Sequence, residues 1–83
     1  MLKLEKDVLT VEIPQGKNQD ELLETLDKEL KEKEKELYGL DLKITGRLTA
    51  TMAMFIGHKL CHICKTVSLF APLENRYVLV IQH

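Results

Sequence analysis

Apolar and polar residues alternate along several short stretches of the chain, and this period of two predicts β-strands. In the segment 8–14, Leu9, Val11 and Ile13 alternate with positions that include Thr10, as is typical of a strand with one buried face. The strands expected on this basis are 2–5, 8–14, 40–45, 66–70 and 76–82, with turns at 6–7 and 71–75.

Two other stretches repeat their apolar residues with the period of an α-helix. Leu22, Leu26 and Leu30 lie on one stripe of a helix that we expect to begin after an Asn18 cap and to run to about residue 38, just before Gly39. The second helix is expected over 48–64 and is apolar nearly all round, which indicates burial.

The predicted element order is ββαβαββ in a single α+β domain, 1–83, with two helices covering one or both faces of a small sheet. If the third and fourth strands are parallel, Gly46 and Arg47 lie at the carboxyl end of a strand, where ligands bind in open α/β sheets.

Composition narrows the range of functions. Twelve basic residues against thirteen acidic ones give a net charge of −1, which argues against a generic DNA- or RNA-binding protein. It does not exclude a compact anionic ligand, because a local pocket needs only a few donors. A chain of 83 residues buries a modest core and often gains stability by oligomerising. Two cysteines without a recognisable signal peptide indicate a reducing, cytoplasmic compartment, and no apolar run approaches the roughly 20 residues of a membrane span.

Reactive side chains concentrate at the end of the second predicted helix. His58, Cys61 and His62 have the i, i+3, i+4 spacing that places side chains on one helix face, and Cys64 follows closely. Imidazole and thiolate bind transition metals, and imidazole also transfers protons near neutral pH. The alternative is that both cysteines are small core residues and the histidines are partly buried polar groups. A four-ligand zinc site is sterically awkward within so few residues.

The tripeptide Thr45-Gly46-Arg47 is a second candidate site. A glycine at a strand end allows close backbone approach, and the N–H groups at the start of the next helix can hold a phosphate that Arg47 contacts as well. The alternative is an ordinary strand-to-helix turn with a solvated arginine. Lys59 and Arg76 are further candidate anion contacts, and for each the alternative is again a solvated side chain.

The segment 44–83 resembles the CRISPR-associated ring nucleases of the Csx-three, or Crn-three, type. The resemblance rests on Ile44-Thr45-Gly46-Arg47, Gly57-His58-Lys59, the strand from Val67 that runs into Phe70-Ala71-Pro72, and the valine-rich strand that ends in Gln82-His83. The first forty residues match only in the order of their elements.

The resemblance implies a cytoplasmic α+β homodimer related to the ferredoxin-like fold, which binds and cleaves cyclic oligoadenylate, in particular cyclic tetra-adenylate, and so switches off type III CRISPR signalling. Two dimers can sandwich the ring, which gives a ligand-induced tetramer. Cleavage would depend on a divalent metal, typically Mn²⁺. The implied roles are catalysis and metal binding for His58 and His83, and ligand binding for Gly46, Arg47, Lys59 and Arg76.

The chain departs from the family pattern at several positions. Ala71 stands where the family has an aspartate, and Leu73 stands where it has an arginine. A carboxylate is the natural ligand for Mn²⁺, a hard cation, so its loss puts cleavage in doubt. The alternatives to a ring nuclease are therefore a non-catalytic module that sequesters the cyclic nucleotide, and a small zinc-stabilised interaction domain.

Overall fold

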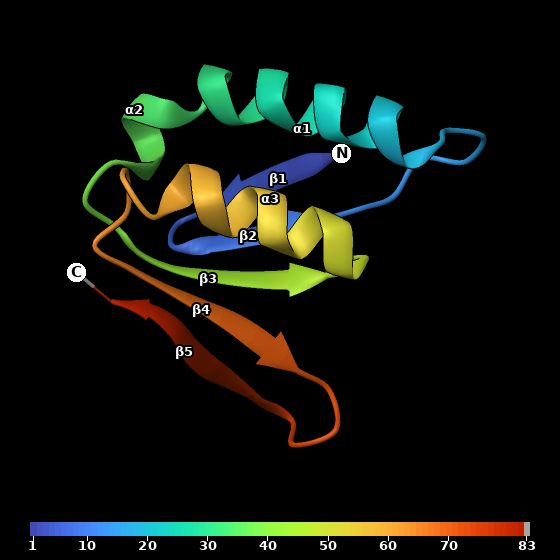
Figure 1. Ribbon diagram of the computed structural model, residues 1–83. Helices are drawn as coiled ribbons and strands as arrows, with labels where there is room; N and C mark the ends of the chain where they lie inside the picture. Colours follow the sequence, from blue (N-terminus) through green and yellow to red (C-terminus); the bar gives the residue numbers. More distant parts are fainter. Residues whose placement is uncertain (83) are drawn as a thin grey trace.

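The computed structural model describes residues 1–82, in which a five-stranded mixed sheet carries three helices on one face (Figure 1). The predicted α+β class and the five strands are confirmed. The elements are β1 (Leu2–Glu5), β2 (Val8–Val11), α1 (Gln19–Glu32), α2 (Glu34–Leu37), β3 (Asp41–Gly46), α3 (Ala50–Leu60), β4 (Thr66–Ala71) and β5 (Arg76–Gln82).

The strands lie in the sheet in the order in which they occur in the chain, β1-β2-β3-β4-β5. The outer pairs, β1–β2 and β4–β5, are antiparallel hairpins, whereas β2–β3 and β3–β4 are parallel. Each parallel pair needs a crossover connection. α1 and α2 together connect β2 to β3, and α3 connects β3 to β4. The condition that the third and fourth strands be parallel is met, so Gly46 does lie at the carboxyl end of β3.

The first helical segment is broken, contrary to the prediction of one continuous helix to about residue 38. α1 ends at Glu32, and Lys33 donates its backbone N–H to the carbonyls of both Glu29 and Leu30, at 3.2 Å each. No apolar residue continues the Leu22–Leu26–Leu30 stripe one turn later, at 33 or 34. The separate turn α2 instead brings Leu37 into the core.

The core is a single apolar layer between the helices and the sheet. α1 contributes leucines at four-residue intervals, α3 contributes residues at the same interval, and the strands contribute alternate residues. Its fully buried members include Leu9, Leu22, Leu26, Leu37, Leu42, Met52, Ile56, Leu60, Val11 and Val67. The helices cover one face only, which leaves the opposite face of the sheet open to solvent.

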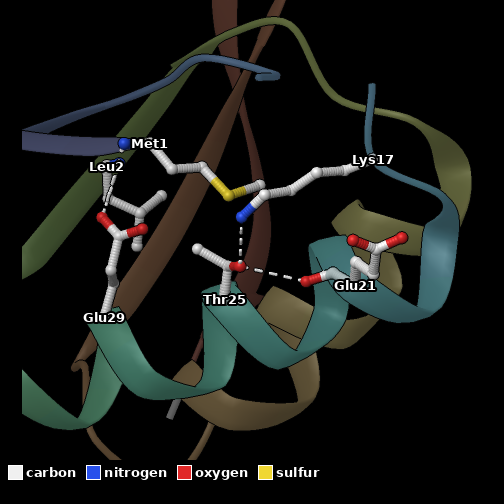
Figure 2. A network of polar contacts seen from close by, with 6 residues as sticks. All are labelled: Met1, Leu2, Lys17, Glu21, Thr25 and Glu29. Carbon is white, nitrogen blue, oxygen red and sulfur yellow. Dashed lines mark hydrogen bonds and ion pairs between the residues drawn. The ribbon is translucent and has the colours of Figure 1, made fainter. Parts of the chain in front are cut away.

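Polar contacts fasten the N-terminal part of the chain to α1 (Figure 2). The carboxylate of Glu29 accepts a hydrogen bond from the backbone N–H of Leu2 at 3.0 Å and lies 3.5 Å from the amino group of Met1. Nearer the N-terminus of α1, Lys17 Nζ donates to Thr25 Oγ1 at 3.2 Å, and that hydroxyl donates to the carbonyl of Glu21. β1 and the loop before α1 are thereby held against the same helix.

Several predicted boundaries also move, those of β3 and β4 by a single residue. β2 stops at Val11, although residue 12 still donates its backbone N–H to the carbonyl of Met1, and Pro14 has no N–H to extend the ladder. α3 begins after Thr49, which caps it, and ends at Leu60, four residues short of the prediction of 64. Among residues 1–82, we find no helix with the length and apolar character needed to cross a membrane.

Candidate functional site

Gly46 ends β3 in a conformation that favours glycine. Its φ is +106°, and a Cβ atom built on it would lie only 2.2 Å from the carbonyl oxygen of Val11 and 2.8 Å from the Val11 nitrogen. Gly46 pairs with Val11 in the parallel ladder, and the next residue, Arg47, donates its backbone N–H to the same carbonyl at 3.0 Å. The close approach of β2 therefore explains why this position requires glycine.

The turn from Gly46 to the start of α3 has a positive electrostatic potential. Arg47 is exposed and has no ion pair with any residue in the described range. Thr49 Oγ1 accepts a hydrogen bond from the N–H of Met52 and donates to Gln19 Oε1 at 3.1 Å. The first turn of α3 has no acidic residue, unlike that of α1. The partial positive charge at the N-terminus of α3 and the guanidinium of Arg47 therefore both favour a bound anion.

His58 and His62 lie together at the other end of α3. Both are exposed, and their rings are 6.2 Å apart between centroids with an interplanar angle of 86°. His58 is eight residues after Ala50, so the helix rise places it about 12 Å along the axis from the start of α3. The structure thus separates His58 from Gly46 and Arg47, and one chain does not gather them in one pocket.

The two cysteines have different environments. Cys64 is buried, its thiol donates to the carbonyl of Leu37 at 3.5 Å, and burial raises its pKa to about 11. Cys61 is partly exposed, and its thiol donates to the carbonyl of His58 at 3.0 Å. Within residues 1–82 no three His, Cys, Asp or Glu side chains are grouped for a metal ion. The four-residue zinc set is therefore not assembled, and Cys64 is a core residue.

Two of the predicted anion-binding cations are already paired. Lys59 Nζ lies 3.1 Å from an Asp27 carboxylate oxygen and 5.4 Å from the centroid of the Phe55 ring. Hydrogen bonding from Lys31 and then from Lys59 lowers the pKa of Asp27, which favours the ionised pair.

Arg76, at the start of β5, contacts Glu74 in the preceding turn, with Nη2 at 2.9 Å and Nε at 3.0 Å from the same carboxylate oxygen. A phosphate would have to compete with these carboxylates for Lys59 and Arg76, but not for Arg47 within the described residues.

The remaining predicted positions divide between the two ends of the sheet. Ala71 is the last residue of β4, where it pairs with Arg76. Because β4 runs parallel to β3, Ala71 lies at the same end of the strands as Gly46. At the opposite end of the strands, Gln82 pairs with Thr66, near the end of α3. His83 lies outside the described residues.

Sequence reasoning did not single out an aromatic pair on the open face of the sheet. Phe70 on β4 and Tyr77 on β5 pack edge to face with centroids 5.2 Å apart. Lys43 Nζ lies 5.9 Å from the centre of the Tyr77 ring and 3.6 Å from an Asp7 carboxylate oxygen. The alternation in β4 and β5 could have placed both rings on one face. Their pairing, however, depends on the register.

Comparisons with protein-family models, with curated proteins and with solved structures found no match for this chain.

Proposed function

We propose that the chain is a cytoplasmic ring-nuclease-like protein that binds cyclic oligoadenylate, in particular cyclic tetra-adenylate, and that it acts in type III CRISPR signalling. The observation that carries the proposal is the Gly46–Arg47 turn at the carboxyl end of a parallel strand. The homodimer, the ligand-induced tetramer and a relation to the ferredoxin-like fold belong to the same proposal.

The turn suits a phosphate for two reasons. The exposed guanidinium of Arg47 can form two parallel hydrogen bonds to phosphate oxygens, whereas the space beside Gly46 is taken by the backbone of Val11. The following helix begins without a carboxylate in its first turn, so its N-terminal N–H groups do not face a competing acidic side chain from that turn. A cyclic nucleotide with several phosphates could meet one such turn from each of several chains.

Cleavage, where it occurs, would use the 2′-hydroxyl next to a scissile phosphate as the nucleophile. That reaction needs a base, an acid for the leaving oxygen and an in-line geometry. His58 is exposed in the last turn of α3, so its imidazole is accessible for one of these proton transfers. Because His58 and Arg47 lie at opposite ends of α3, a nuclease that used both on one phosphate would have to take them from different chains. This separation supports an assembly larger than a monomer.

The proposed Mn²⁺ site requires a separate assessment. The resemblance assigns the metal to His58 and His83, of which only His58 lies in the described part of the chain. Ala71 supplies no carboxylate, and it lies at the carboxyl end of β4, whereas α3 ends near the start of that strand. Imidazoles alone are a poor match for a hard cation that prefers oxygen ligands. The described residues therefore do not fit Mn²⁺ well, and the proposed proton transfer by His58 includes no metal step.

The test is binding of cyclic tetra-adenylate by calorimetry, followed by a cleavage assay with and without Mn²⁺. Arg47→Ala should weaken binding by about tenfold or more, since it removes a charge-assisted bidentate contact. Lys28→Ala is the matched control, because Lys28 is an exposed cation on α1 and should bind the ring as the wild type does. No binding at micromolar protein would end the proposal.

A non-catalytic module that sequesters the ring is the second candidate, and alanine at position 71 is the observation that favours it. Ala71→Asp distinguishes the two functions. Metal-dependent cleavage by this variant would identify a nuclease that has lost its carboxylate. Tight binding without cleavage in both proteins would identify a binding module.

His58→Ala separates a functional histidine from a structural one. His58 is exposed, so we expect a small change in melting temperature. If His58 is the general acid or base, turnover should fall by roughly two to four orders of magnitude, with a smaller change in ring affinity. A large fall in melting temperature with unchanged ring binding and cleavage would show that the role of His58 is packing.

A further inference from the structure

We propose that His58 and His62 form a two-point chelating site for a borderline divalent metal such as Zn²⁺, Ni²⁺ or Cu²⁺. This pairing differs from the proposed Mn²⁺ site, because it uses His62 in place of His83 and needs no carboxylate. The proposed site of His58 and His62 does not depend on whether the chain binds a nucleotide.

The backbone places the two imidazoles on one face. Past the end of α3 the chain continues in hydrogen-bonded turns: Cys61 donates its N–H to the carbonyl of Gly57 at 3.0 Å, and Cys64 donates to the carbonyl of Leu60 at 2.9 Å. These turns keep the rings of His58 and His62 side by side, with centroids 6.2 Å apart. Both histidines are exposed, so their rings can turn toward a common point without displacing core residues.

The observed spacing is close to what a shared metal requires. Two imidazoles bound tetrahedrally at metal–nitrogen distances of about 2.0–2.1 Å have ring centroids about 5 Å apart. The centroids of His58 and His62 are 6.2 Å apart. A change of roughly 1 Å lies within the reach of rotations about exposed side-chain bonds, which cost little compared with a shift of the backbone.

The ligand type selects the metal. Nitrogen ligands favour Ni²⁺, Cu²⁺ and Zn²⁺ over Mn²⁺, following the usual order of divalent affinities. The C-terminal end of a helix also carries partial negative charge, which favours a bound cation. No third His, Cys, Asp or Glu within residues 1–82 completes the site, so water would fill the other positions. The Cys61 thiol is directed to the His58 carbonyl instead.

The experiment titrates untagged protein with Ni²⁺, Zn²⁺ and Mn²⁺ salts in calorimetry, with thermal unfolding as a second measurement. We expect one Ni²⁺ per chain at micromolar to submillimolar affinity, a higher melting temperature with Ni²⁺, and much weaker Mn²⁺ binding. His58→Ala and His62→Ala should each lower Ni²⁺ affinity by about tenfold or more, because each leaves a single imidazole.

Two control variants test the assignment. Cys61→Ser and Lys28→Ala should bind Ni²⁺ as the wild type does. Wild-type affinity in His62→Ala, or loss of binding in Cys61→Ser, would overturn the pairing of His58 with His62. Absence of Ni²⁺ binding to the wild type at millimolar metal would overturn the site altogether. None of these outcomes depends on ring binding, so they test this site separately from the proposed nucleotide function.

Discussion

Replacing Gly46 with alanine tests the close approach of β2 to the turn before α3. A non-glycine residue held at the φ of +106° costs about 1–3 kcal/mol in backbone strain. In addition, the new Cβ would lie 2.2 Å from the Val11 oxygen, so one of the two backbones must move by about 1 Å. That movement disturbs the 3.0 Å hydrogen bond from Arg47 to Val11, which contributes about 0.5–1.5 kcal/mol. We expect Gly46→Ala to lower the free energy of unfolding by about 2–4 kcal/mol.

Gly39→Ala is the matched control. Gly39 also has a positive φ, +75°, but an added Cβ there meets no atom within 4 Å. Both substitutions restrict the unfolded chain equally, so that contribution cancels in the comparison. The difference between the variants isolates the contact with Val11 and should be at least about 1 kcal/mol, or about 4–8 °C in melting temperature for a domain of this size.

The assay is urea and thermal unfolding followed by circular dichroism, on both variants and the wild type. Equal melting temperatures for Gly46→Ala and Gly39→Ala would refute the argument, because they would show that β2 does not crowd Gly46. A wild-type melting temperature in Gly46→Ala would also refute the positive φ.

Two further predictions concern ionisable groups. Contacts with Lys31 and Lys59 lower the pKa of Asp27 below its ordinary value of 3.8, so its stabilising effect is present above that pH and is lost as the pH falls through the lower, folded value. Asp27→Asn should therefore lower the urea midpoint at pH 7 and have little effect at pH 2; equal midpoints for variant and wild type at pH 7 would contradict this. The buried Cys64 thiol, with its pKa raised to about 11, should resist iodoacetamide at pH 8, whereas Cys61 reacts, so mass spectrometry should count one label on the native chain and two in urea. Two labels on the native chain would show that Cys64 is accessible.

Local patterns were enough to predict most of the secondary structure. Alternation identified the strands, and Asn18 does cap α1, with Glu21 completing a capping box. The break at Lys33 was missed because the charged block 31–36 contains good helix formers. Whether the helix continues through this block depends on whether Leu37 can then reach the core. That is a property of tertiary packing, which the sequence pattern does not reveal.

The candidate site was predictable in part. The strand-to-helix turn at Gly46 is where the sequence placed it, because a glycine between a strand and a helix is a local signal. The pairing of Lys59 with Asp27 was not foreseen, since 32 positions separate the two residues and only the packing of α3 against α1 brings them together. The distance between Arg47 and His58 follows from the rise of the helix between them and was not predicted.

The combination of antiparallel outer pairs and parallel inner pairs in the sheet also bears on how the chain folds. The β1–β2 and β4–β5 hairpins join segments that are adjacent in sequence, so each can form early at little cost in loop entropy. β3 has no such neighbour: both of its ladders are parallel, and each closes only after a helical crossover is in place. We therefore expect the central strand to be the last to find its partners, and each hairpin to expose an unpaired inner edge until it does. Folding speed and resistance to aggregation should therefore depend on β3, the strand that ends in Gly46.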